Sequence, residues 1–291
     1  MVGSKRVVKP KRRAILELFS GCGRFSGAAG KAGFNIVCPF ELDKGCQFDV
    51  LNPKIEKVIR RWISSGKIWH VHFGTPCTIW SVASSPDAVD KKQGYACAVF
   101  TLRLLKFLVK YGVSFTIENP ASSALFKWEP MAKFLCKHAK GWARTDYCRW
   151  GASLLKPTII VSSLLVIQEL SRRCIGGHCH EHLQGIVKVL CGGKCISKWK
   201  TSLAGTYPPA LCHAWVQLLG REAPAEARCP HSSDCMSSDW ETELCNAINL
   251  VVDKPLPTPT CPTKWVDLWP ADAASWGQSW GPWIAPKACV V

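Results

Sequence analysis

Between Arg13 and Ser162 the sequence alternates between short apolar runs and longer amphipathic stretches. The apolar runs have the length of buried strands, whereas the intervening stretches show helical periodicity. The predicted strands cover residues 14–19, 35–42, 68–73, 114–118, 145–150 and 158–162. The predicted helices cover residues 24–32, 54–63, 95–111, 123–138 and 208–219. This alternation predicts an α/β fold with a largely parallel sheet and helices on both faces.

Such a sheet also predicts where functional residues should lie. Ligands of open parallel sheets bind beyond the carboxyl ends of the strands. The segments that leave predicted strands and enter helices are therefore the first places to look for functional residues.

Composition and periodicity divide the chain into five segments. We expect a flexible basic arm, a catalytic core, a Cys/His-rich insertion that includes a small recognition segment, a closing helix of the core, and a poorly ordered tail rich in proline and tryptophan. These are residues 1–13, 14–162, 163–203, 204–221 and 222–291.

Charge is distributed unevenly along the chain. The net charge is +16 overall, but residues 221–291 hold five Lys/Arg and nine Asp/Glu, which leaves +20 on the rest. Such a basic body favours polyanions, and nucleic acid is the simplest of them. Solubility alone is the other explanation. The six lysines and arginines of Lys5–Arg13 are typical of a phosphate-binding arm or a nuclear import signal.

The cysteines and the apolar segments bear on the compartment. The chain has 17 cysteines, an odd number, and no apolar region of a signal peptide follows the basic arm. The longest apolar run, 158–167, is too short to span a bilayer. We therefore expect reduced thiols in an intracellular protein, with the nucleus as one compartment, and no membrane partner.

The first predicted strand opens into Phe19-Ser-Gly21-Cys-Gly23, and a helix follows. Two glycines allow close approach of a ligand to the backbone, and a helix start offers free N–H groups. Glu41 ends the next predicted strand, where an acid can accept hydrogen bonds from a ribose. The loop predicts a nucleoside site, with a tight turn that binds nothing as the alternative.

Two further strand ends carry reactive groups. Gly74-Thr-Pro-Cys77 follows one predicted strand, and a cysteine there is placed to act as a nucleophile. Glu118 and Asn119 end the neighbouring strand. A buried structural thiol is the other interpretation of Cys77.

In order, these motifs resemble those of the cytosine carbon-5 DNA methyltransferases. The resemblance covers roughly residues 14–160 and implies a Rossmann-like, S-adenosylmethionine-dependent methyltransferase fold. It implies Cys77 as the nucleophile that attacks carbon 6 of cytosine and Glu118 as the acid at ring nitrogen 3. It also implies a set of residues that contact S-adenosylmethionine, namely Phe19, Gly21, Gly23, Glu41, Asp49 and Pro76.

The chain departs from that family in several places. The family's Gln-x-Arg-x-Arg motif is replaced by Tyr147-Cys-Arg149-Trp-Gly151, with Lys156 after it, and we assign Arg149 to the catalytic site. The family's C-terminal Gly-Asn motif is absent, and only about 40 residues remain for recognition of a target sequence. Two alternatives to a DNA methyltransferase therefore stay open: an inactive nucleic-acid-binding protein and an RNA cytosine methyltransferase.

The Cys/His-rich insertion is a candidate zinc site. Zinc prefers four tetrahedral Cys or His ligands. The predicted ligands are Cys174, His178, His180 and Cys195, with Cys179 and His182 as substitutes. A polar loop that binds no metal is the alternative.

Overall fold

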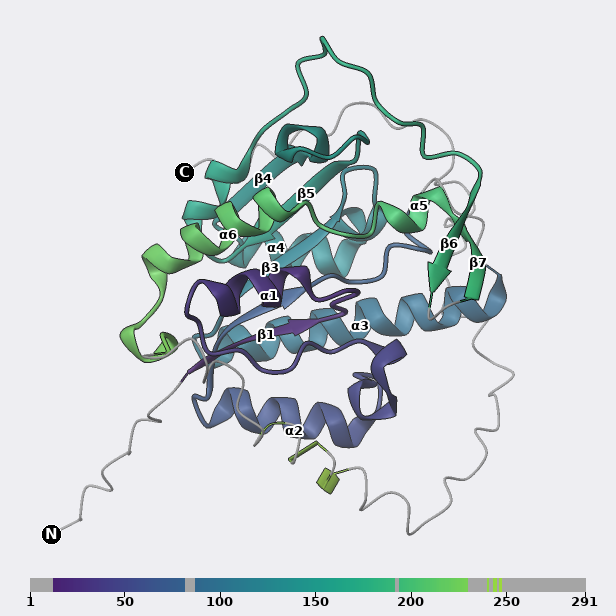
Figure 1. The fold of residues 1–291 in the computed structure, drawn as a ribbon. Coiled ribbons are helices and arrows are strands. Elements are labelled where there is room, and N and C mark those ends of the chain that lie inside the picture. The colour runs from purple at the N-terminus through teal and green to yellow at the C-terminus, as the bar shows by residue number, and fades with distance from the viewer. Residues whose placement is uncertain are drawn as a thin grey trace, which may run out of the picture.

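A five-stranded sheet forms the centre of the molecule in the computed structural model (Figure 1). The structure describes residues 13–81, 87–191, 194–229, 240, 243–244 and 246–247. The strand order is β1-β2-β3-β5-β4. The strands are β1 (Ala14–Leu18), β2 (Ile68–Phe73), β3 (Ser114–Pro120), β4 (Gly141–Asp146) and β5 (Pro157–Ser162).

The direction of the strands is mixed. β1, β2 and β3 run parallel, whereas β5 runs antiparallel to both of its neighbours, β3 and β4. The α/β class and the mostly parallel sheet are thus confirmed, with one reversed strand that the sequence pattern did not predict. Its reversal has a simple cause: β4 and β5 are joined by a short connection, and short connections join antiparallel strands.

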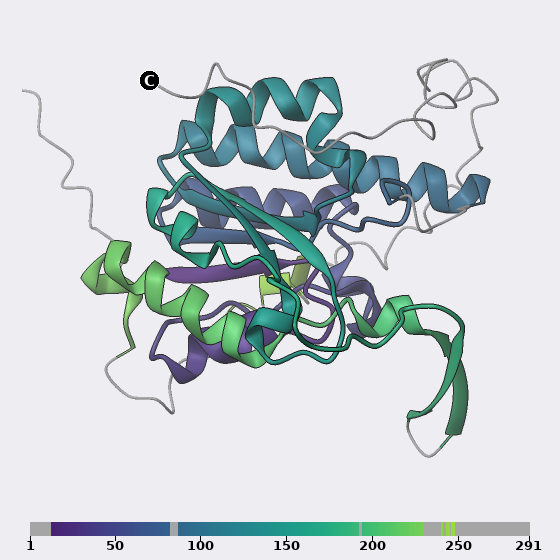
Figure 2. The ribbon, with the colours of Figure 1, turned by 90° about the horizontal axis from the view of Figure 1, so that it is seen from above.

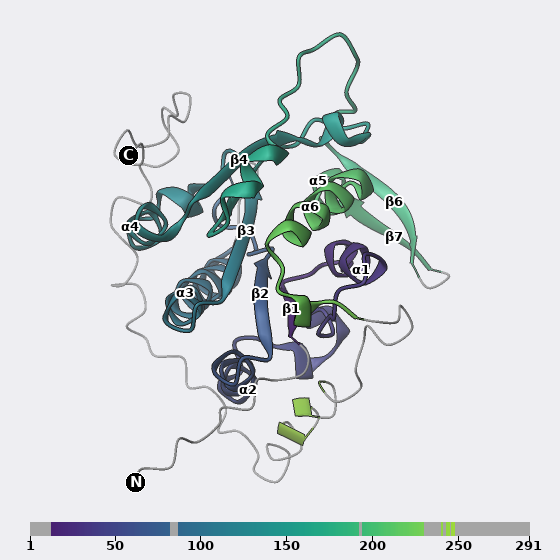
Figure 3. The same ribbon diagram turned by 90° about the vertical axis from the view of Figure 1, so that its left-hand side faces the viewer.

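Helices cover both faces of the sheet (Figure 3). α1 and α6 pack together on one face, while α2, α3 and α4 cover the other. The helices are α1 (Arg24–Lys31), α2 (Pro53–Ser64), α3 (Ala88–Lys110), α4 (Glu129–His138), α5 (Lys200–Leu203) and α6 (Pro209–Glu222).

Each face has its own apolar core, and β1 shows how the sequence supplies both. Leu16 and Leu18 belong to the core under α2, α3 and α4, whereas Ile15 belongs to the core under α1 and α6. Successive side chains of a strand point to opposite faces. A strand covered on both faces is therefore mostly apolar, as the run Ala14–Leu18 is apart from the buried Glu17.

Residues 35–42, predicted to be a strand, do not form a regular one. The segment pairs with β1 only through two isolated bridges, Ile15 with Ile36 and Leu18 with Phe40. Pro39 lies between them and has no N–H to donate, which interrupts the ladder at the edge of the sheet. The strand predicted at 145–150 ends at Asp146 and continues as the 3-10 segment η4 (Tyr147–Trp150).

The segment 163–203 contains four different structures, the last of which is the short helix α5 (Lys200–Leu203). The 3-10 segment η5 (Leu165–Leu170) packs on β4 and α6 and buries Ile167 and Leu170. An exposed loop follows, and then the two-stranded hairpin of β6 (Ile186–Cys191) and β7 (Lys194–Trp199). The hairpin projects from the body of the molecule (Figure 2).

Packed residues continue beyond the expected core boundary at 221. Ala227 is buried, and the guanidinium of Arg228 lies 4.1 Å from the Phe34 ring centre. Trp240, from the expected tail, packs edge-on against Trp62 of α2. Glu243 accepts hydrogen bonds from Trp62 and Lys67.

The basic arm, apart from Arg13, and most of the expected tail lie outside the described residues. Within the part of the chain that is described, no helix combines the length and apolar character needed to cross a bilayer.

Candidate active site

The segments that follow β1 and β2, together with the end of β3, meet around one cavity of about 280 Å³. They meet because the three strands are parallel and their carboxyl ends lie at the same edge of the sheet. The cavity is lined by residues that the sequence singled out, namely Phe19, Gly21, Glu41, Pro76, Cys77 and Glu118.

The loop after β1 has an unusual backbone. Phe19 has a φ of 58°, the one positive φ recorded for a non-glycine residue in the described chain. Such backbone strain is characteristic of functional loops. A Cβ on Gly74 would lie 2.6 Å from the Phe19 carbonyl oxygen, so glycine is required where the loops after β1 and β2 touch.

Glu17, which lies in β1 just before this loop, fixes the start of α1. Its side chain is fully buried, and one carboxylate oxygen accepts the Ser26 N–H at 2.9 Å. The other oxygen has no hydrogen-bond partner in the described structure. Burial raises the pKa of Glu17 to about 7, against the lowering effects of Ser26 and Lys44.

Glu41 joins the first loop to the next one. Its carboxylate accepts the Gly21 N–H at 2.6 Å and the Leu42 N–H at 3.2 Å. A second cavity of about 240 Å³ adjoins the first and shares Phe19, Glu41 and Pro76 with it. Asp49 lines this second cavity.

Cys77 lies in the loop after β2, partly buried. The loop is held by Asn119, whose amide donates a hydrogen bond to the Thr75 carbonyl oxygen at 2.8 Å. Burial raises the pKa of the Cys77 thiol and the Glu118 carboxylate raises it further, whereas Lys156 lowers it. Proton removal from this thiol therefore depends on the nearby cation.

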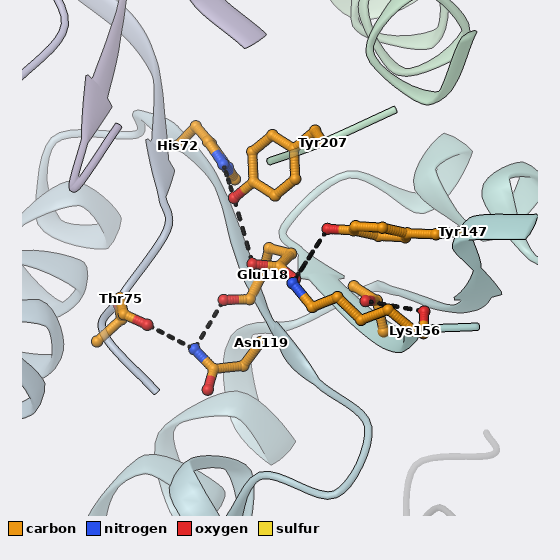
Figure 4. A network of polar contacts seen from close by, with 8 residues as sticks. His72, Thr75, Glu118, Asn119, Tyr147, Lys156 and Tyr207 are labelled. Atoms are coloured by element: carbon orange, nitrogen blue, oxygen red, sulfur yellow. Dashed lines mark hydrogen bonds and ion pairs between the residues drawn. The ribbon is translucent and has the colours of Figure 1, made fainter. Parts of the chain in front are cut away.

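Three polar side chains surround the Glu118 carboxylate (Figure 4). Tyr207 donates a hydrogen bond to one oxygen at 3.2 Å, while Tyr147 and Lys156 reach the other at 3.5 and 3.3 Å. Lys156 also contacts the Tyr147 hydroxyl at 3.2 Å. Glu118 is 6% exposed, so these partners replace the water that a buried carboxylate loses.

The reversed strand explains the position of Lys156. β5 is antiparallel, so its first residue, Pro157, lies at the edge where the parallel strands end. Lys156 directly precedes it, and Pro120 of β3 pairs with Thr158. A parallel strand would have placed this lysine at the opposite edge.

The hydrogen bonds continue behind Glu118 into the sheet. Tyr207 contacts His72 Nε2 at 3.1 Å (Figure 4). His72 Nδ1 contacts Thr116 at 3.0 Å. Since Tyr207 donates to Glu118, His72 donates through Nε2 and accepts at Nδ1. Burial lowers the pKa of His72 well below its usual value, which keeps the imidazole neutral. Burial and Glu118 raise the pKa of Tyr207 well above normal, which keeps its hydroxyl a donor.

Two predicted site residues lie outside both cavities. Gly23 adopts a φ of 70° at the start of α1, and a Cβ there would lie 3.3 Å from the Pro39 ring. Arg149 is exposed in η4 and lines neither cavity. Lys156 and Arg24 are the cations that line the first cavity.

Sequence reasoning assigned no role to Tyr207, Tyr147 or His72. Tyr207 comes 89 residues after Glu118, and no local pattern links the two. The alternation of His70 and His72 along β2 is a visible signal, but it is equally typical of structural residues.

Four potential metal ligands gather away from these cavities. The ligand atoms of Cys148, Cys174, His178 and His180 all lie within 4.8 Å of one another, and the group can hold a metal ion. Three of the four were predicted from the sequence. The side chain of the fourth predicted ligand, Cys195, lies outside what the structure describes. Cys179 and His182 are exposed and do not belong to the group.

Comparison with protein-family models found no match for this chain, and comparison with curated proteins found none either. Its function must therefore be argued from its own residues and their geometry.

Proposed function

We propose that this chain is an S-adenosylmethionine-dependent methyltransferase that modifies carbon 5 of cytosine in nucleic acid, with DNA as the preferred polymer. One observation carries the proposal: a single cavity is lined both by the predicted nucleoside-binding residues Phe19 and Glu41 and by the predicted reactive residues Cys77 and Glu118. The residues expected to bind the cofactor and those expected to react with cytosine thus line the same cavity.

The two adjoining cavities suit the proposed cofactor. Glu41 lines both and can accept hydrogen bonds from ribose hydroxyls, and Asp49 in the second cavity offers an acceptor for an adenine amino group. Nothing lies within 4 Å of the Cβ position of Gly21, which leaves room for a ligand there. When bound, S-adenosylmethionine supplies an electrophilic methyl group.

The reactive residues suit attack on a pyrimidine ring. Carbon 5 of cytosine is a weak nucleophile, and addition of the Cys77 sulfur to carbon 6 makes it reactive as an enamine. Glu118 would contact ring nitrogen 3 and stabilise the charge that develops there. After methylation a base removes the proton from carbon 5, and the sulfur leaves carbon 6 with its bonding electron pair, restoring the free enzyme thiolate.

Two features support nucleic acid as the substrate: the basic charge of the chain and the need for a cytosine to enter the cavity. The basic character of residues 1–220 favours a polyanion. A cytosine within a duplex must leave its base stack to reach a cavity that holds a thiol and a carboxylate. RNA offers the same base and the same phosphates, so the experiment must include both polymers.

An inactive nucleic-acid-binding protein is the second candidate. The observations that favour it are the family motifs that the chain lacks and the position of Cys77, where burial and the nearby Glu118 carboxylate raise the pKa of the thiol and so disfavour the nucleophilic thiolate. In this alternative the fold and the basic surface remain while methyl transfer is lost.

Methyl transfer from labelled S-adenosylmethionine to DNA and to RNA tests the proposal. The wild-type protein should label cytosine, Cys77→Ser should abolish labelling while retaining S-adenosylhomocysteine binding, and Glu118→Gln should slow it by ~10² or more. Cys46→Ser, at an exposed position outside both cavities, is the matched control.

An oligonucleotide with 5-fluorocytosine provides an independent test. A base cannot remove the fluorine at carbon 5 as it removes a proton, so the sulfur is not eliminated. The wild-type protein should therefore remain covalently attached through Cys77. Full labelling by Cys77→Ser would disprove the mechanism. Cofactor binding with no labelling of either polymer would favour the inactive binding protein.

A further inference from the structure

We propose that Cys148, Cys174, His178 and His180 bind one structural zinc ion, which joins the exposed loop of residues 171–182 to the turn η4 beside Glu118. The inference concerns metal binding and does not depend on the proposed methyl transfer. Its central claim is that Cys148, from the core, is the fourth ligand in place of Cys195.

The distances within the group match a tetrahedral zinc site. With Zn–S near 2.3 Å and Zn–N near 2.0 Å, tetrahedral geometry separates a sulfur from a nitrogen ligand by about 3.5 Å. The Cys174 sulfur lies 3.6 Å from His180 Nε2 and 3.8 Å from His178 Nε2. The ligand atom of Cys148 lies within 4.8 Å of all three.

Neighbouring backbone groups orient these ligands. His178 Nδ1 lies 3.0 Å from the Gly176 carbonyl oxygen, which holds the proton on Nδ1 and leaves Nε2 free for a metal. The Gly176 N–H is directed at the Cys174 sulfur at 3.4 Å, which fixes the position of that sulfur relative to the turn. Gly176 and Gly177 both have a φ of 78°, so the turn between the ligands needs glycine.

The ligand types select zinc and a structural role. Two thiolates and two imidazoles in a tetrahedral arrangement are typical of Zn²⁺, whereas oxygen-rich sets suit magnesium and calcium. Four protein ligands also close the coordination shell. A catalytic zinc would keep a position open for water or substrate.

The surroundings of the loop explain why it needs a metal. Most side chains of residues 171–182 are exposed, so the loop has little apolar core of its own. Its other attachments to the core are few. The Cys174 N–H bonds to Asp146 at 2.6 Å, the Asp146 N–H bonds to the Arg172 carbonyl, the Glu181 N–H bonds to the Ser153 carbonyl, and the Arg172 guanidinium lies 4.0 Å from the Trp150 ring centre. A zinc ion would add four coordination bonds and so stabilise a loop that buries little apolar surface.

The site lies next in sequence to the residues around Glu118. Cys148 follows Tyr147, whose hydroxyl contacts both Lys156 and Glu118. Fixing Cys148 therefore fixes the backbone that carries Tyr147. The zinc ion would thus support the wall of the first cavity from a distance, as a positioning element.

Zinc content of the purified full-length chain tests the proposal. We expect about one equivalent in the wild-type protein and less than about a tenth in Cys148→Ser and Cys174→Ser, because structural sites bind tightly. The matched controls Cys179→Ser and His182→Ala change exposed neighbours in the same loop and should retain the metal. Cys195→Ser should also retain it.

X-ray absorption on the wild-type protein tests the ligand set without any variant that could misfold. The expected first shell is two sulfur and two nitrogen atoms. A shell with three sulfurs, full zinc content in Cys148→Ser, or a wild-type protein purified without chelator that holds no zinc would each overturn the proposal.

Discussion

Two acidic side chains, Glu17 and Glu118, are buried in the same sheet in different polar surroundings. Glu118 has Tyr207, Tyr147 and Lys156 around both of its oxygens. Glu17 accepts one backbone N–H and leaves one oxygen unpaired. Burial raises the pKa of Glu17 because a buried carboxylate loses the water that stabilises its charge. Residues of the same type therefore acquire different chemistry from their neighbours.

Glu17 should make stability depend on pH. Its pKa is raised to about 7 from an ordinary value of 4.5, so the folded protein holds a proton there that the unfolded chain releases. The contribution of this carboxyl group to the free energy of unfolding should thus fall by about 2 kcal/mol between pH 5 and pH 7, whereas the buried imidazoles of His70 and His72, whose pKa values burial lowers, contribute in the opposite direction. Urea denaturation of the wild type and of Glu17→Gln at both pH values measures this contribution, because the free energy of unfolding of the wild type relative to that of the variant should fall by about 2 kcal/mol from pH 5 to pH 7. The exposed control Glu222→Gln should leave it intact, and an unchanged dependence in Glu17→Gln would refute the assignment.

Lys156 should control the reactivity of Cys77. Burial and Glu118 raise the pKa of the thiol, and Lys156 is the cation that lowers it. Lys156→Met should therefore raise that pKa further and slow alkylation of Cys77 by iodoacetamide at pH 8 at least several-fold. Peptide mass spectrometry separates Cys77 from the other thiols. The exposed control Lys106→Met should have no effect, and equal rates in Lys156→Met would show that the lysine does not act on this thiol.

At the scale of elements, the loops after β1 and β2 are built against each other. The carbonyl of Phe19 approaches Gly74 so closely that a side chain has no room. Asn119 at the end of β3 then ties the second loop down through Thr75. The cavity is therefore shaped by contacts between three strand ends, and a change in one loop should alter the other.

Gly74→Ala tests this packing. Its Cβ would lie 2.6 Å from a backbone oxygen, so one loop must shift, and we expect a loss of about 1–3 kcal/mol in the free energy of unfolding. The affinity for S-adenosylhomocysteine, measured by calorimetry, should fall because Phe19 moves. Gly27→Ala is the matched control, since Gly27 lies in α1 with nothing within 4 Å of its Cβ position. Equal stability of Gly74→Ala and wild type would contradict the close packing.

At the scale of the whole molecule, charge and fold serve different parts of nucleic-acid recognition. The sheet edge gathers the reactive groups at one place, whereas the excess of Lys/Arg is spread over residues 1–220. Spread charge attracts a polyanion irrespective of its sequence. A chain of this kind should bind phosphates broadly and select its target base at the cavity.

Binding to duplex DNA should depend strongly on salt. Each phosphate contact contributes about −0.9 to the slope of log affinity against log salt concentration. We expect affinity to fall at least ~10-fold from 50 to 200 mM salt, measured by fluorescence anisotropy. Removal of residues 1–12 deletes five Lys/Arg and should make the slope shallower. Affinity that stays constant over this range would remove the main physical support for a nucleic-acid partner.

Local sequence patterns determined much of this molecule. The apolar run Ile68–Phe73 and the amphipathic stretch at 54–63 match β2 and α2 closely, since period and length depend on neighbouring residues. The parallel order predicted for the first strands places Phe19, Cys77 and Glu118 at one edge of the sheet, where the structure has them. A chain of alternating elements has few other ways to bury its apolar faces.

Tertiary structure alone decided the rest. The reversal of β5 brings Lys156 to Glu118, the return of the chain before α6 brings Tyr207 to the same carboxylate, and η4 brings Cys148 to the Cys/His loop. Each of these contacts joins residues far apart in sequence. No periodicity records them, because they depend on which strands pair and in which direction, and that is settled by the packing of the whole chain.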